Sequence, residues 1–104
     1  RVYVHPLVAG YLADLAAETR KQDRVAMGVS PRGTLALMRA AKALACMEGR
    51  DYLIPDDVKA LAPDVLSHRL IFAYGGGRQE EAKGLMEEIL SRVPVPVEDF
   101  GRRG

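Results

Sequence analysis

The sequence predicts an all-α domain: a bundle of four helices with a long apolar helix in its centre and room for a minimal strand pair. Tryptophan is absent and aromatic residues make up only 6% of the chain, so the core must be built from Leu, Val, Ala and Met, which favours helices. Apolar residues recur at helical spacing in separate segments, and Pro and Gly stand where helices begin and end. A chain of 104 residues forms one domain.

The first helix is predicted from about Pro6 to Gln22, after an extended lead-in over residues 1–5. Pro6 suits the first helical position, where no N–H is needed. Arg20 and Lys21 oppose the negative end of the helix dipole. The inner face is formed by apolar residues at helical spacing, namely Leu7, Val8, Tyr11, Leu12 and Leu15.

The second helix is predicted from its capping residues and its composition. Ser30 is a good N-cap, Pro31 fits the first helical position, and Gly49 supplies a C-cap. Residues 34–47 are mostly Ala, Leu and Met, so this helix is apolar on nearly every side and belongs in the middle of the bundle. Cys46, which lies within it, is predicted to be a small buried residue.

The third helix is predicted to begin at Pro55, after an extended segment over residues 51–54. Asp56 and Asp57 place negative charge in its first turn, as the dipole prefers. Pro63 removes a hydrogen-bond donor from the interior of this helix, so we expect two short pieces or a kink.

The fourth helix is predicted from about Gln79 to Arg92, after a glycine-rich turn over residues 74–78. Alternating Val and Pro over residues 93–97 cannot continue it. We therefore expect a helical domain over residues 1–93 and a Pro-containing, flexible C-terminal tail over residues 94–104.

Composition and charge exclude several classes of protein. Fifteen Lys and Arg against fourteen Asp and Glu leave a net charge of +1, which argues against a domain held mainly by nucleic-acid phosphates. A single cysteine allows no internal disulfide or thiolate zinc cluster and suits the reducing cytoplasm. No stretch approaches the roughly 20 apolar residues that a membrane span needs. The chain begins with Arg, which we interpret as a piece excised from a longer protein.

Catalytic and metal-binding constellations are scarce in the sequence. His5 and His68 lack metal-ligand spacing to another His or Cys. The glycine run over residues 75–77 lacks the following Lys and the preceding strand of a phosphate-binding loop. The chain is therefore not expected to bind and cleave a nucleoside triphosphate alone by that route.

Arg32 is the candidate functional residue, because it falls in the first turn of the second helix. The helix dipole is already positive there, so a cation is disfavoured by roughly 0.3–1 kcal/mol. Free N–H groups and a guanidinium at a helix start make a good phosphate site, because Arg can bind two phosphate oxygens at once. A solvated Arg with no ligand is the alternative.

Five motifs in order resemble the small helical lid domain of the MoxR branch of the AAA+ ATPases. These motifs are Tyr11-Leu12 with Leu15, leading to Thr19-Arg20; Gly28-Val29-Ser30-Pro31-Arg32-Gly33; Gly49-Arg50-Asp51-Tyr52; Pro55-Asp56-Asp57-Val58; and Leu66-Ser67-His68-Arg69-Leu70. Their order and spacing match the family over about residues 2–72. Residue 33 departs from the pattern, since Gly stands where the family usually has Ala.

The resemblance implies that Arg32 is the second sensor, which reaches across a cleft to the terminal phosphate of ATP. It also implies a preceding large domain that holds the phosphates and Mg²⁺, neighbouring subunits in a ring, and chaperone-like action on a client protein that the sequence does not identify. In such a protein Arg32 would stabilise charge on the transferred phosphoryl group and tie lid position to nucleotide state.

Other singled-out residues have ordinary structural interpretations. His68 and Arg69 suit a capping and packing pair at a helix end, although a functional role stays open. Arg50 with Asp51 suits the ordering of a turn. Tyr11 is interpreted first as a core residue, and second as a neighbour of the adenine.

Two other functions compete with the lid reading. One is a histone-fold-like module that binds nucleic acid, since a long apolar helix followed by a short extended segment fits that plan too. The other is a ligand-free bundle that binds proteins.

Overall fold

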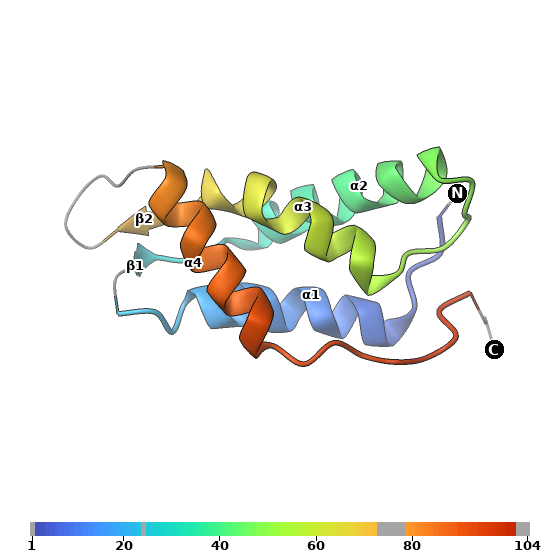
Figure 1. The fold of residues 1–104 in the computed structure, drawn as a ribbon, viewed down its shortest axis with the longest axis horizontal. Coiled ribbons are helices and arrows are strands. Elements are labelled where there is room, and N and C mark those ends of the chain that lie inside the picture. Colours follow the sequence, from blue (N-terminus) through green and yellow to red (C-terminus); the bar gives the residue numbers. More distant parts are fainter. Residues whose placement is uncertain (1, 24, 73–78, 102–104) are drawn as a thin grey trace.

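The computed structural model describes residues 2–23, 25–72 and 79–101 of the chain. Four helices dominate these residues: α1 (Pro6–Thr19), α2 (Pro31–Met47), α3 (Pro55–Ser67) and α4 (Gln79–Arg92). Helix α3 packs between α2 and α4, and α1 contacts all three of the others. Figure 1 shows α2 and α3 side by side along one long edge of the molecule, α1 along the other, and α4 crossing over them. The four-helix prediction is confirmed, and the bounds of α4 agree with those predicted.

Helix α1 begins at Pro6, as predicted, and its cap is a histidine. The Nδ1 of His5 accepts the N–H of Leu7 at 3.0 Å, which satisfies one of the donors that a helix start leaves unpaired. The helix ends at Thr19 rather than at the predicted Gln22. It ends early because the N–H groups of Arg20 and Lys21 turn back to carbonyls only three residues earlier.

Helix α2 has the predicted caps. The hydroxyl of Ser30 accepts the N–H of Gly33 at 3.3 Å, and Gly49 takes the left-handed conformation (φ 80°) after the helix end. The helix does not lie in the middle of the bundle, however. It buries a single stripe with a four-residue period (Gly33, Leu37, Ala41 and Ala45), while Met47 is 83% exposed. Ala is small and tolerates both water and core, so an Ala-rich composition did not distinguish the two faces.

Cys46 is exposed, so the prediction that it is buried was wrong. It directly follows Ala45, which belongs to the buried stripe, and one residue turns a helix by about 100°. The side chain at position 46 therefore points away from the core.

We predicted two short pieces or a kink at Pro63; helix α3 runs unbroken through this residue, which rules out the two pieces. A proline in a helix interior leaves the carbonyl four residues earlier without its N–H partner. That carbonyl belongs to Lys59, which is exposed, so water can replace the lost donor.

The predicted minimal strand pair is present. Strands β1 (Val25–Met27) and β2 (Ile71–Phe72) pair antiparallel and close the end of the bundle where α2 begins. At the opposite end, Tyr3 and Tyr52 form a single parallel bridge, because the N–H of Tyr3 donates to Asp51 and the N–H of Leu53 donates to Tyr3. The predicted extended segment over residues 51–54 is thus held by the lead-in before α1.

The core lies between the four helices and is aliphatic, as predicted. Its largest fully buried side chains include Leu12, Leu15, Leu37, Leu66 and Ile89. Within the described residues, no helix is long and apolar enough to cross a membrane. After α4 the chain is not helical, and residues 94–101 run back along α1 to its N-terminal end, where Phe100 is only 8% exposed.

Tyr11 is a core residue with an unusual hydroxyl. The side chain is 2% exposed, and its Oη has no hydrogen-bond partner among the described residues. Burial raises the pKa of Tyr11 above its ordinary value, and the nearby carboxylate of Asp56 raises that pKa further. The unfolded chain therefore ionises this group at lower pH than the folded chain does.

Tyr11→Phe is expected to leave the free energy of unfolding at pH 7 unchanged or to raise it by up to about 1 kcal/mol, because the lost hydroxyl has no partner. A raised folded pKa contributes stability below the unfolded pKa of about 10 and loses it as pH rises through the folded pKa. The alkaline decline of stability should therefore be shallower in Tyr11→Phe. Urea unfolding at pH 7 and above pH 10 measures both effects, with Tyr52→Phe as the control. A cost above about 1 kcal/mol at pH 7 would show that the hydroxyl has a partner.

Candidate functional site

Arg32 lies in the first turn of α2. It is exposed, and among the described residues no carboxylate pairs with its guanidinium. The two N–H groups that follow it, those of Gly33 and Thr34, are taken by the side chain and the carbonyl of Ser30. The N–H of Arg32 itself has no acceptor within the described part of the chain. At a helix start, the backbone N–H and the guanidinium of one Arg can both donate hydrogen bonds to the oxygens of a phosphate.

The loop before α2 is held by the last residues of α1. The hydroxyl of Thr19 is fully buried, accepts the N–H of Val29 at 3.0 Å and donates to the carbonyl of Ala16 at 2.6 Å. Nη2 of Arg20 donates to the carbonyl of Val29 at 3.1 Å. Thr19 and Arg20 therefore bind both backbone groups of Val29, and this contact fixes where α2 begins.

The glycine at position 28 permits this close approach. A Cβ at residue 28 would lie 2.8 Å from the hydroxyl oxygen of Thr19 and 3.0 Å from the backbone nitrogen of Arg20. Real Cβ atoms essentially never come as close as the first of these distances, the second is unusually tight, and the backbone of Arg20 has little freedom to move. Any larger residue would therefore push the loop off the end of α1.

The structure also explains why residue 33 is Gly. A Cβ there would lie 2.7 Å from Cγ1 of Val29 and 2.9 Å from Cδ of Arg69, so the stem of Arg69 occupies the space that Ala would need. Arg69 follows the end of α3, where His68 occupies the C-cap position. Arg69 is exposed, and none of the described residues forms an ion pair with it. Its guanidinium therefore adds positive charge beside the start of α2.

A second polar cluster lies at the other end of α2 and is structural. Arg50 forms a two-pronged ion pair with Asp57, and both N–O distances are 2.7 Å. Arg50 also donates to the carbonyl of Tyr52, and Asp57 accepts the N–H of Ile54 at 3.0 Å. The hydrogen bond to Asp57 raises the pKa of Arg50 above its ordinary range, against the opposing effect of partial burial. The turn-ordering role predicted for Arg50 is confirmed, with Asp57 as its partner.

The Arg50–Asp57 pair and the Arg32 site lie at opposite ends of α2, which is about 25 Å long for its 17 residues. Arg50 and Arg32 therefore do not act on one small ligand. Among the described residues, no group of three or more His, Cys, Asp or Glu side chains is placed to hold a metal ion. The sequence motifs located Arg32, but only the structure shows that Thr19, Arg20 and Arg69 surround the loop that leads to it.

Comparison with known proteins gives the same family for sequence and fold. The family model described as "AAA lid domain" matches residues 17–92. Chaperone MoxR1 of Mycobacterium tuberculosis is 36% identical over 104 residues, which cover 90% of this chain and 28% of that protein. The uncharacterized protein YeaC of Bacillus subtilis is 46% identical over 91 residues, which cover 85% of this chain and 28% of that protein.

A solved structure shares the fold. A candidate ATPase from Cytophaga hutchinsonii superposes with a TM-score of 0.77 and 30% sequence identity, over 92% of this chain and 32% of that one. The chain thus spans under a third of the length of each of these proteins. The family model covers most of the chain, and its matched residues include Arg32 and the Thr19–Arg20 contact with Val29. The chain belongs to the AAA lid domain family, and within it to the lids of MoxR-type AAA+ ATPases.

Proposed function

We propose that this chain is the lid of an ATP-driven ring machine and that Arg32 is its second sensor, contacting the terminal phosphate of ATP. The observation that carries the proposal is the place of Arg32 in the first turn of α2, where neither its guanidinium nor its N–H has a partner among the described residues. A cation without a counter-charge at this position is unfavourable in the lid alone. It becomes favourable once an anion binds there.

The rest of the nucleotide site belongs to a large domain outside this chain. In this proposal, that domain holds the adenine nucleotide and Mg²⁺, and this lid closes over the phosphates. When bound, ATP and Mg²⁺ supply the phosphoryl group and neutralise part of its charge. Arg32 orients and stabilises the terminal phosphate, Ser30 keeps the start of α2 in place, and Thr19 and Arg20 hold the loop that precedes it.

The same proposal names the partners and the compartment. The lid contacts the large domain of its own chain and a neighbouring subunit of a ring, acts on a client protein in a chaperone-like way, and works in the cytoplasm. The MoxR1 relative is named a chaperone, which supports this reading.

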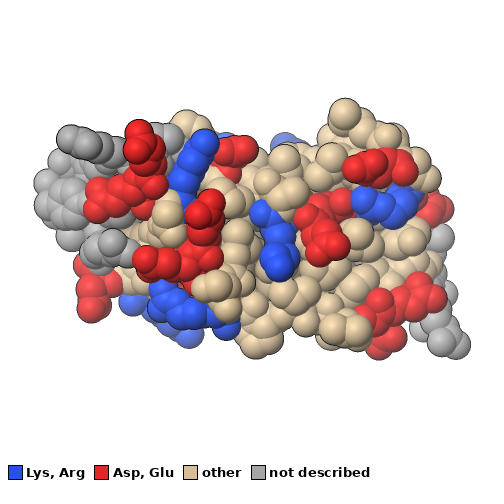
Figure 2. All heavy atoms as spheres, viewed as in Figure 1, with Lys and Arg blue, Asp and Glu red and all other residues tan. Residues whose placement is uncertain are grey.

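Binding to nucleic acid is not part of the proposal. The net charge is +1, and Figure 2 shows basic and acidic side chains interspersed over the face that carries α4. On this face the basic side chains do not form the continuous stripe that phosphate backbones require.

Hydrogen exchange in a full-length protein that carries this chain tests the nucleotide contact. A non-hydrolysable ATP analogue is expected to slow amide exchange over residues 28–35 more than ADP does, because only the third phosphate reaches Arg32. Residues 43–50, at the other end of α2, serve as the internal control. Equal protection by the two nucleotides over residues 28–35 would contradict the proposed contact.

A further inference from the structure

The segment after α4 returns along the bundle and ends in a buried aromatic side chain. Residues 94–101 pass between two shallow apolar grooves, one lined by Pro6, Leu7 and Tyr11, and the other by Ile54 and Pro55. Val97 is 92% exposed, whereas Phe100 is 8% exposed. Contact with the bundle is therefore concentrated at Phe100, beyond an exposed stretch of chain.

Phe100 packs against the residue that caps α1. The rings of Phe100 and His5 meet edge to face, with 5.7 Å between their centroids and an interplanar angle of 83°. Tyr3 contacts the His5 ring in the same geometry at 6.4 Å. The His5 ring thus lies against two aromatic side chains while its Nδ1 accepts the N–H of Leu7.

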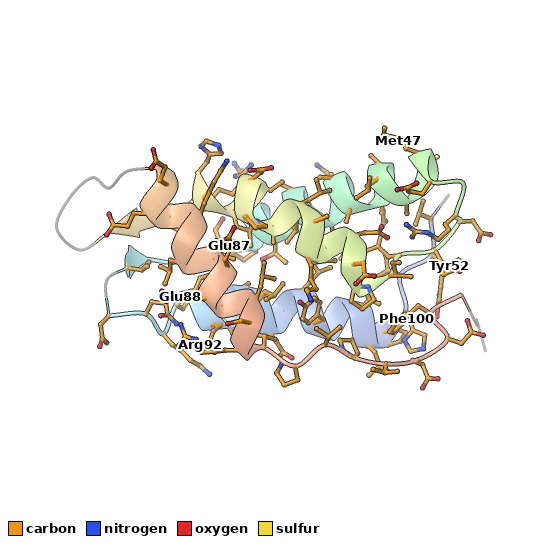
Figure 3. The ribbon with its side chains drawn as sticks, viewed as in Figure 1. Met47, Tyr52, Glu87, Glu88, Arg92 and Phe100 are labelled. Carbon is orange, nitrogen blue, oxygen red and sulfur yellow. The ribbon has the colours of Figure 1, made fainter. Side chains whose placement is uncertain are left out.

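The next residue, Gly101, contacts the other side of the same junction. A Cβ at position 101 would lie 3.1 Å from two ring carbons of Tyr52, so the backbone passes directly over that ring. Tyr52 pairs with Tyr3 in the parallel bridge. Figure 3 shows Tyr52 and Phe100 together at the end of the molecule where α1 and α3 begin. Gly101 therefore lies against Tyr52, one partner of the bridge that holds residues 2–5 to the bundle, while Phe100 reaches Tyr3, the other partner, through the ring of His5.

The backbone of residues 94–101 can leave the bundle without breaking a hydrogen bond to a described helix residue. Pro94 and Pro96 have no N–H to donate, and within the described residues no hydrogen bond joins residues 94–101 to the four helices. The side-chain hydrogen bonds of the segment are local: Glu98 accepts the N–H of Asp99, and Asp99 accepts the N–H of Gly101. Release would therefore cost the apolar contacts of Phe100 and leave the helices intact.

We propose that residues 94–101 form a detachable strap that docks Phe100 against His5 and so holds residues 2–5 on the bundle. This inference rests on the proposed function for its consequence, since residues 2–5 are then the connection to the nucleotide-holding domain. A docked strap fixes the angle at which the lid leaves that domain. A released strap frees the connection, so residues 94–101 set how stiffly the lid follows the nucleotide.

Hydrogen exchange of a full-length protein carrying Phe100→Ala tests the strap without nucleotide. The amides of Tyr3 and Leu53, which form the bridge, and of Leu7, which His5 caps, are expected to exchange about tenfold faster or more. Amides in the middle of α2 should keep their rates. The matched control is Val97→Ala, which shortens an exposed side chain of the same segment and should change none of these rates.

Two results would overturn the strap. Unchanged exchange at Tyr3, Leu7 and Leu53 in Phe100→Ala would show that the segment holds nothing in place. Faster exchange spread evenly over all four helices would show that Phe100 is only part of the core. Neither readout involves nucleotide, so failure of the strap is distinguishable from failure of the Arg32 proposal.

Discussion

Replacing Arg32 by Ala is expected to lower the ATP hydrolysis rate of a full-length protein that carries this chain by about 100-fold. The guanidinium would otherwise stabilise charge on the terminal phosphate during transfer, and Ala offers neither charge nor donor. The lid itself should stay folded, because Arg32 is exposed and none of the described residues pairs with it. The far-UV circular dichroism spectrum and the unfolding midpoint should therefore match those of the unmodified protein.

Two further variants make this result specific. Arg39→Ala removes an exposed cation from the same face of α2, two turns further along, and should leave the rate within about twofold. Arg32→Lys keeps the charge but loses the planar fork, so it should recover only part of the rate. If Arg32→Ala and Arg39→Ala had equal rates, Arg32 would have no special place in the site.

Replacing Asp57 by Ala is expected to lower the free energy of unfolding by about 3 kcal/mol. This is the largest effect on stability that we expect from removing any one charged side chain of this domain. The carboxylate is buried and accepts three hydrogen bonds, two from Arg50 and one from the N–H of Ile54. Its removal leaves Arg50, whose side chain is only 21% exposed, without this counter-charge. The melting temperature should fall by roughly 10 °C or more for a domain of this size.

The Lys83–Asp64 pair provides the matched contrast, since its N–O distance of 2.9 Å is nearly the same. Both of its side chains are largely exposed, at 44% and 66%, so water competes with the pair. Asp64→Ala should therefore cost less than about 1 kcal/mol. Equal costs for Asp57→Ala and Asp64→Ala, measured by urea unfolding, would show that burial does not decide the strength of these pairs.

The helices were predictable because their signals are local. Ser30 and Pro31 mark the start of α2, Gly49 marks its end, and the apolar stripe of α4 is read from spacing alone. The errors arose where tertiary contacts decide the outcome. Helix α1 ends three residues before Gln22, because the side chains of Thr19 and Arg20 bind the backbone of the following loop at Val29. Helix α3 tolerates Pro63 because the carbonyl that loses its N–H partner belongs to an exposed residue.

The candidate site was predictable only in part. Arg32 was found because a cation at a helix start conflicts with the helix dipole and because its motif resembles a family. The contacts of Thr19 and Arg20 with Val29 join residues about ten positions apart through a loop whose path the sequence does not reveal. The packing of Arg69 on Gly33 spans 36 positions and becomes apparent only in the folded chain.

Nucleotide affinity measured by calorimetry, with and without Arg32, tests the central claim most directly. If Arg32 contacts the terminal phosphate, Arg32→Ala should weaken binding of a non-hydrolysable ATP analogue by about tenfold or more and leave ADP binding nearly unchanged, because a charge-assisted hydrogen bond contributes about 1.5–3 kcal/mol. Equal losses for the two nucleotides, or no loss for either, would place Arg32 away from that phosphate.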